Sequence, residues 1–124
     1  MLYRVSGGLI GAYIGVPILL LTTTGRRTGR SRTTPLLCLE DGANWVVIAS
    51  NGGDDRHPAW WLNLKRTPVA TIQVKRRTNR VRAREATEGE RSRLWPLAVR
   101  MYANYEDYQC RTRREIPIVI LEPA

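Results

Sequence analysis

The chain has 124 residues, the size of one ordinary domain, so we expect a single domain over residues 1–124 and no separate catalytic domain. Its 43% hydrophobic and 25% charged residues exclude a disordered tail. Twenty basic residues, nearly all arginine, against eleven acidic ones give a net charge of +9, which indicates an anionic partner such as nucleic acid, a membrane surface or a small polyanion.

The N-terminal lead segment, residues 1–15, runs into an apolar stretch over residues 8–21 that is too short, and too interrupted by Gly11, Gly15 and Pro17, to span a membrane. No signal-peptide cleavage site follows it. We expect a reduced, cytoplasmic protein, because Cys38 and Cys110 have no disulfide or zinc-binding spacing. Peripheral contact with the inner face of the cell membrane is an alternative for the lead segment, since an apolar segment beside arginine clusters suits anionic lipid.

The first two predicted strands enclose a basic loop. Residues 16–23 are aliphatic and β-branched and stop before Gly25, and residues 31–40 are extended, with Pro35 as the only interruption. Residues 22–35 hold four arginines and no acid. Glycines let this loop turn tightly, and its arginines and threonines supply donors for phosphate or carboxylate. We interpret it as an anion-binding loop, with a solvated loop as the alternative.

A turn at residues 40–44 leads to a third strand, residues 45–49, whose continuous apolar run predicts burial on both faces. We expect these three strands to form a meander. The loop that follows begins Ser50-Asn51-Gly52-Gly53, and adjacent glycines at a strand end let a backbone approach a ligand closely, with a plain turn as the alternative. A short helix then begins at Pro58 and ends before Pro68.

Two further strands are predicted at residues 69–75 and 81–86. The second one alternates arginines with small apolar residues, so one of its faces is basic. The arginines are Arg80, Arg82 and Arg84. Residues 75–84 together carry +6, and we assign this basic segment no function.

The C-terminal part combines helices with one more strand. Residues 87–90 form a capping box that starts a helix, which Pro96 is expected to kink or divide. A capped turn at residues 104–108 follows. The last strand, residues 116–121, contains Pro117, which favours an edge or barrel-closing position.

These elements predict a mainly β (α+β) fold, a small barrel of about six antiparallel strands with two or three short helices. The single histidine, His57, cannot build a catalytic triad or a metal site, and no paired carboxylates are suitably placed. An enzyme with this sequence would therefore need an organic cofactor. Tyrosines spaced three residues apart could line a pocket wall or pack in the core. They are Tyr102, Tyr105 and Tyr108.

Five segments in chain order carry a resemblance to a known family: LLLTTTGRRTGRSRTTPLL, VIASNGGDDRHPAWWLNLKRTP, AREATEGERSRLWP, MYANYEDYQ and IPIVILEP. Over residues 16–123 the chain resembles the deazaflavin-dependent nitroreductases, the class A group of coenzyme F420-dependent oxidoreductases. The resemblance implies a split β-barrel of the flavin-reductase type. It also implies an enzyme that transfers a hydride from reduced coenzyme F420 to a quinone, a nitroaromatic or a similar electrophile, without a metal.

The resemblance further implies roles for individual residues. The basic loop would hold the phosphate and polyglutamate tail of the cofactor, and the neighbouring strand, loop and helix would complete its groove. The implied cofactor-binding residues are Arg26, Arg27, Thr28, Arg32, Pro35, Leu37, Ser50, Asn51, Gly52, Gly53, Ala59, Trp60 and Asn63. The implied substrate-binding residues are Ser50, Tyr102, Tyr105 and Tyr108.

Two of these residues are also implied to be catalytic. Ser50 would orient the acceptor, and Tyr105 would stabilise or protonate the developing oxyanion. Asn51 and Leu37 stand where the family often has a lysine and an aromatic residue, which bears on substrate preference.

The alternative function is a non-enzymatic barrel that binds nucleic acid through its basic strand. Binding of single strands needs aromatic residues interleaved with the basic ones. The tyrosines lie instead in a predicted helical region, so the sequence disfavours nucleic acid as the partner.

Overall fold

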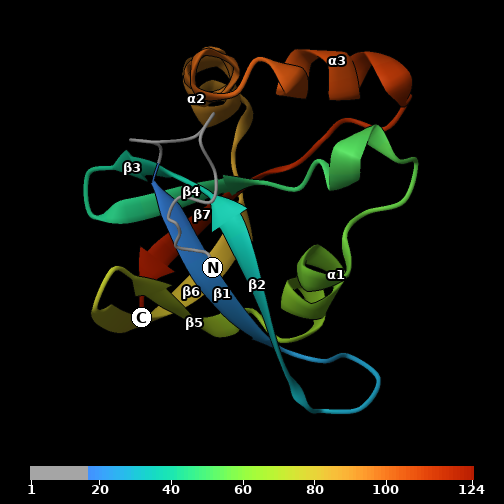
Figure 1. Ribbon diagram of the computed structural model, residues 1–124. Helices are drawn as coiled ribbons and strands as arrows, with labels where there is room; N and C mark the ends of the chain where they lie inside the picture. Colours follow the sequence, from blue (N-terminus) through green and yellow to red (C-terminus); the bar gives the residue numbers. More distant parts are fainter. Residues whose placement is uncertain (1–16) are drawn as a thin grey trace.

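The computed structural model describes residues 17–124, which form one seven-stranded antiparallel sheet with three α-helices packed against it (Figure 1). The strands are β1 (Ile18–Thr24), β2 (Ser31–Leu37), β3 (Leu39–Asp41), β4 (Asn44–Ile48), β5 (Val69–Val74), β6 (Arg77–Glu85) and β7 (Ile118–Pro123). The helices are α1 (Ala59–Arg66), α2 (Glu88–Met101) and α3 (Asn104–Arg111), and a 3-10 helix, η2, spans Asn51–Gly53. The expected mainly β fold is confirmed, and the lead segment 1–15 lies outside the described residues.

The sheet curls because one short segment, residues 31–41, supplies the strands at both of its edges. The strand order is β2-β1-β5-β6-β7-β4-β3, so β2 and β3 are the outermost strands, although only Cys38 separates them in the chain. Cys38 is buried, and its N–H donates to the carbonyl of Pro17 at 3.1 Å. The prediction of one strand over residues 31–40 is therefore wrong. The break lies at Cys38, between β2 and β3, whereas β2 continues through Pro35. The pairings of the predicted meander are present, since β2 pairs with β1 and β3 pairs with β4, but its middle strand is divided at Cys38.

β7 lies inside the sheet, between β6 and β4. Pro117 precedes its first residue, and the carbonyl of Pro117 accepts a hydrogen bond from the Ala49 N–H at 3.0 Å. Because Pro117 stands before the strand, its missing N–H removes no bond from the sheet. Of the two positions predicted for this strand, edge or barrel-closing, the edge is therefore wrong.

The basic face predicted for β6 is confirmed, with Arg80 and Arg82 exposed and the alternating Val81 and Ala83 buried. Arg84 is bound within the fold. Its two terminal nitrogens donate to the Glu90 carboxylate at 2.7 and 2.8 Å, and its Nε pairs with Glu122 at 3.1 Å. The Arg84 guanidinium holds the pKa of Glu90 at about 2. One arginine of this strand thus fastens α2 to the sheet.

The predicted capping box starts α2. The Thr87 hydroxyl accepts from the Glu90 N–H at 3.2 Å, and the Glu90 carboxylate accepts from the Thr87 N–H at 2.9 Å. The helix then continues through Pro96, so the prediction that this proline divides it is wrong. Burial of Leu94 and Ala98 against the sheet offsets the hydrogen bond that proline cannot make.

Two apolar clusters stabilise the fold. The first joins the inward-facing residues of the sheet, such as Leu19 and Leu21, to Trp61 of α1. The second joins the other side of β4 and β7 to α2 and α3, which lie together above the sheet in Figure 1, and it includes Tyr105. Within residues 17–124, no helix is both long enough and apolar enough to cross a membrane.

Candidate functional site

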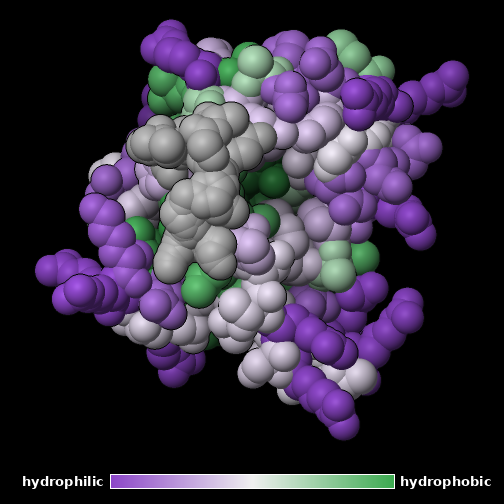
Figure 2. Space-filling model, in the orientation of Figure 1, coloured by the Kyte–Doolittle hydropathy of each residue, from purple (hydrophilic) through white to green (hydrophobic). Residues whose placement is uncertain are grey.

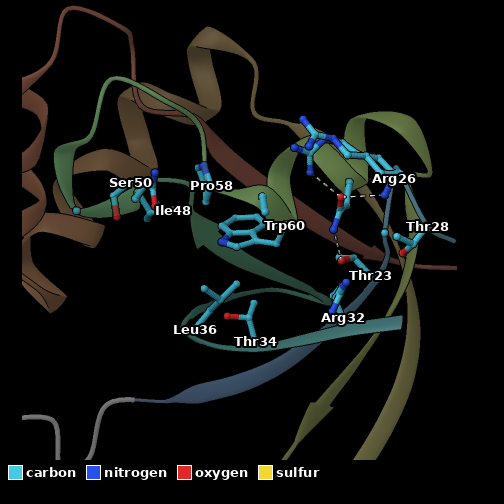
Figure 3. A pocket seen from close by; sticks show the side chains of 16 residues that line it. Thr23, Arg26, Thr28, Arg32, Thr34, Leu36, Ile48, Ser50, Pro58 and Trp60 are labelled. Carbon is cyan, nitrogen blue, oxygen red and sulfur yellow. Dashed lines mark hydrogen bonds between the residues drawn. The ribbon is translucent and has the colours of Figure 1, made fainter. Parts of the chain in front are cut away.

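An open cavity of about 680 Å³ lies between β2, the loop after β4 and the start of α1. On the face shown in Figure 2, hydrophilic side chains form the rim and hydrophobic surface lies in the central recess. Figure 3 shows the cavity from close by. Its lining residues are Thr23, Gly25, Arg26, Arg27, Thr28, Arg32, Thr34, Leu36, Ile48, Ser50, Asn51, Gly52, Pro58, Ala59, Trp60 and Asn63.

One end of the cavity is basic. Arg26 and Thr28 of the hairpin loop between β1 and β2 gather there with Arg32 at the start of β2 (Figure 3). The Gly25 N–H donates to the Arg30 carbonyl at 2.7 Å and closes this loop. Arg27 and Arg32 are exposed, and neither forms an ion pair with any residue between 17 and 124. The loop therefore offers two uncompensated guanidinium groups to an external anion.

Asn63 of α1 holds the basic loop in place, with its side chain only 3% exposed. Its Oδ1 accepts from both the backbone N–H and the guanidinium of Arg26, each at 3.1 Å. Its Nδ2 donates to the Thr23 hydroxyl, also at 3.1 Å. These three hydrogen bonds, drawn in Figure 3, connect α1 to the end of β1 and fix the direction of the Arg26 side chain.

The middle of the cavity is apolar. The Trp60 ring lies across it, with Leu36 and Thr34 of β2 on one side and Pro58 on the other (Figure 3). Alternation along β2 puts every second residue, from Arg32 to Leu36, on the cavity side. Aromatic rings pack favourably on an indole, so this part of the cavity is suited to a flat aromatic group.

The loop after β4 forms the opposite end of the cavity, where Ser50 lies beside Ile48 (Figure 3). Asn51 and Gly52 adopt positive φ values of 48° and 63°, which turn the backbone sharply. Gly53 is buried, and a Cβ there would meet the Tyr108 backbone at 3.0 Å. Glycine at this position therefore lets the loop pack closely against α3.

The three tyrosines contact one another and do not line the cavity. Tyr105 is 5% exposed within the second apolar cluster, and its ring meets that of Tyr102 edge-on at 5.0 Å. The hydroxyls of Tyr102 and Tyr108 are hydrogen-bonded at 3.1 Å, and this bond raises the pKa of Tyr108. Their predicted roles in substrate binding and catalysis stay predictions.

The structure brings together ten of the thirteen cofactor-binding residues that the sequence predicts. Three do not line the cavity: Pro35 and Leu37 alternate away from it on β2, and Gly53 is covered by α3. Sequence reasoning missed six lining residues. They are Thr23, Gly25, Thr34, Leu36, Ile48 and Pro58. Thr34 and Leu36 could have been predicted from the sequence, because residues two and four positions after Arg32 point to the same face of a strand.

His57, between this loop and α1, is a half-buried titratable group next to the cavity wall. Its Nδ1 accepts from the Arg114 guanidinium at 3.1 Å, so the ring proton of neutral His57 lies on Nε2. Burial lowers the pKa of His57 below its usual value, and the positive charges of Arg114 and Lys65 act in the same direction, against Glu85.

We expect acid to destabilise the protein through His57. In the unfolded chain a histidine has a pKa near 6.5, whereas the pKa of His57 in the folded protein is lower. The unfolded state therefore binds the proton first, and the free energy of unfolding should fall as the pH drops from about 7 to 5. Urea unfolding across this range measures the effect. His57 is the single histidine of the chain, so His57→Asn, whose amide oxygen can still accept from Arg114, should flatten the dependence. An unchanged slope in this variant would assign the dependence to other groups.

The cavity can bind an elongated ligand that has an anionic end and a flat ring, but the chain supplies little chemistry of its own there. Its only nucleophile-type groups are hydroxyls such as that of Ser50, without a general base in contact with them in the described residues. No group of metal-binding side chains occurs within residues 17–124. These properties fit an organic cofactor that carries the reactive group.

Comparisons with known proteins agree with this interpretation. A family model described as F420H(2)-dependent quinone reductase matches residues 1–123. An F420H(2)-dependent quinone reductase of Mycobacterium tuberculosis is 41% identical over 97% of this chain and 84% of its own length. A solved structure of an F420-H2 dependent reductase is 40% identical, covers 86% of this chain and 94% of its own, and superposes with a TM-score of 0.78.

A more distant similarity concerns the fold alone. An FAD-binding protein from Mesorhizobium loti, 12% identical, covers 87% of this chain and 82% of its own with a TM-score of 0.59. The flavin-reductase type of split barrel and the resemblance to coenzyme F420-dependent oxidoreductases are therefore confirmed. The matched family takes its description from quinone reductases and not from nitroreductases.

Proposed function

Because the chain belongs to the F420H(2)-dependent quinone reductase family, we propose that its cavity binds coenzyme F420 and presents it to a quinone-type acceptor for reduction. The observation that supports this assignment is the distribution of charged, apolar and polar side chains along the cavity. Guanidinium groups occupy one end, an indole and a leucine the middle, and a serine the other end (Figure 3). The alternative of a nucleic-acid-binding barrel is set aside, because the family consists of enzymes.

The described residues fit this cofactor. Arg27 and Arg32, which have no carboxylate partner between residues 17 and 124, would hold its anionic tail, together with Arg26 as fixed by Asn63. Trp60 and Leu36 would contact its ring system. In this proposal Thr34 and Leu36 take the places that the sequence assigned to Pro35 and Leu37.

When bound, the reduced cofactor supplies a hydride. The chain contributes orientation and polarity: the apolar middle excludes water from the ring, and Ser50 offers a hydroxyl to a carbonyl oxygen of the acceptor. A solvent proton can complete the reduction at that oxygen. We propose Ser50 as the hydroxyl at the acceptor, since Tyr105 is buried outside the described lining.

A titration of the purified protein with coenzyme F420, followed by its fluorescence, tests the proposal. Binding should be followed by oxidation of F420H2 upon addition of a soluble quinone, read from the absorbance of the cofactor. A nitroaromatic in place of the quinone tests the wider acceptor range that the sequence predicts. No binding at micromolar protein would refute the function.

Ser50→Ala should lower kcat with the quinone about 10-fold, the loss expected for one hydrogen bond to a developing oxyanion in a partly open site. Affinity for the cofactor should stay within about threefold, since the basic loop is unchanged. Tyr105→Phe is the comparison. If Tyr105 acts on the acceptor as the sequence predicts, this variant loses as much activity as Ser50→Ala; if Ser50 acts alone, it keeps most of it.

A further inference from the structure

Arg114, three residues beyond the end of α3, places its guanidinium among the carbonyl groups of the loop after β4. Its Nη2 donates to the Ser50 carbonyl at 2.8 Å and its Nε to the Asp54 carbonyl at 2.9 Å. Its Nη1 donates to the Ala49 carbonyl at 3.3 Å and to His57 Nδ1 at 3.1 Å. One side chain thus holds both ends of the loop that forms one end of the cavity.

The partners of Arg114 are unusual for an arginine, because no carboxylate is among them. Within residues 17–124 it forms no ion pair, and burial lowers its pKa, while Asp54 and Asp55 oppose that shift from a distance. A cation solvated by backbone carbonyls is less stabilised than one paired with a carboxylate. What this arrangement provides is a fixed geometry, since the rigid fork of the guanidinium can satisfy several acceptors at once.

We propose that Arg114 is a positioning residue for the reaction, because it sets the conformation of the loop that carries Ser50. The peptide bonds here are trans, so the N–H that follows a carbonyl points the opposite way. With the Ala49 and Ser50 carbonyls turned toward Arg114, the N–H groups of Ser50 and Asn51 are directed away from it. Arg114 itself does not line the cavity, whereas Ser50 and Asn51 do.

Contacts next to Arg114 support this assignment. Gly53 lies so close to α3 that a Cβ added to it would meet the Tyr108 backbone at 3.0 Å, and the Thr112 hydroxyl donates to Asp55 at 2.8 Å. The loop and the segment from α3 to Arg114 are therefore joined at several points, and Arg114 is the member that reaches the residues at the cavity.

The inference rests on the proposed function, and Arg114→Ala tests it against Arg113→Ala as the matched control. Arg113 is the preceding residue, is exposed and forms no ion pair within the described chain. Both variants lose one positive charge. At a temperature well below unfolding, Arg114→Ala should lower kcat with a quinone at least about 10-fold while the affinity for coenzyme F420 changes less than about threefold. Arg113→Ala should resemble the wild type.

A second measurement needs neither cofactor nor substrate. Amide hydrogen exchange of residues 49–55 should be faster in Arg114→Ala than in the wild type and Arg113→Ala, with exchange in β4 and β7 unchanged. Arg114→Lys, which keeps the charge but cannot reach all four acceptors, should recover part of kcat. If the wild type does not oxidise F420H2, the proposed function fails, but the exchange experiment still decides whether Arg114 holds the loop.

Two results would overturn the inference. The first is Arg114→Ala with normal kcat and a lower melting temperature, which would make the residue merely stabilising. The second is unchanged exchange of residues 49–55 in that variant, which would mean that other contacts hold the loop.

Discussion

Replacement of Arg27 and Arg32 together by alanine is expected to weaken binding of coenzyme F420 about 100-fold, because each hydrogen bond from a charged donor to an anionic group contributes about 1.5 kcal/mol or more. Both guanidinium groups are exposed at the basic end of the cavity and have no carboxylate partner within residues 17–124. For the same reason, the stability of the folded protein should change little. Fluorescence titration measures the affinity, and thermal unfolding measures the stability.

The matched control is the double variant Arg80→Ala with Arg82→Ala. It removes the same net charge from exposed positions on β6, outside the cavity lining. Its affinity for the cofactor should fall only slightly, and more at low salt than at high salt, because only long-range attraction is lost. Equal losses in the two double variants would show that net charge, and not the hairpin loop, governs binding.

The second large effect is expected at Asn63. Asn63→Ala removes all three hydrogen bonds of a buried side chain and leaves the Thr23 hydroxyl and the Arg26 N–H without their partner. We expect a loss of about 2–3 kcal/mol in the free energy of unfolding, the usual cost of unsatisfied buried groups. Affinity for coenzyme F420 should also fall about 10-fold, since Arg26 is no longer directed toward the cavity.

Asn79→Ala is the control for this substitution, because Asn79 is an exposed asparagine on β6. It should be neutral in urea unfolding and in the titration. Asn63→Asp gives a finer comparison, since its carboxylate can still accept from both donors of Arg26. If Asn63→Ala loses stability but binds the cofactor normally, Asn63 supports the fold without setting the geometry of the basic loop.

The parts of the fold that were predicted correctly depend on local patterns. The alternation in β6 and the capping box at Thr87 each involve residues within a few positions of one another. The errors concern pairing between distant segments. Nothing near Cys38 indicates that the next strand lies at the other end of the sheet, and nothing near Pro117 indicates that β7 has partners on both sides.

The predicted residues coincide with the cavity lining where one loop contributes consecutive residues, as in the basic hairpin. On β2 the resemblance pointed to Pro35 and Leu37, although Arg32 was predicted in the same groove. Successive side chains of a strand point to opposite faces. If Arg32 faces the groove, Thr34 and Leu36 therefore face it too, and Pro35 and Leu37 do not. The role of Arg114 could not be predicted, because an arginine that binds carbonyl groups far away in the chain leaves no pattern in its own neighbourhood.

The place of β7 has a consequence for biosynthesis. Ribosomes make β7 after every strand that it joins, so until then β4 and β6 each expose a row of unpaired backbone groups. A nascent chain in this state can pair with another copy of itself instead of waiting for its own β7. Chaperones that cover exposed strand edges are therefore expected to raise the yield of native protein.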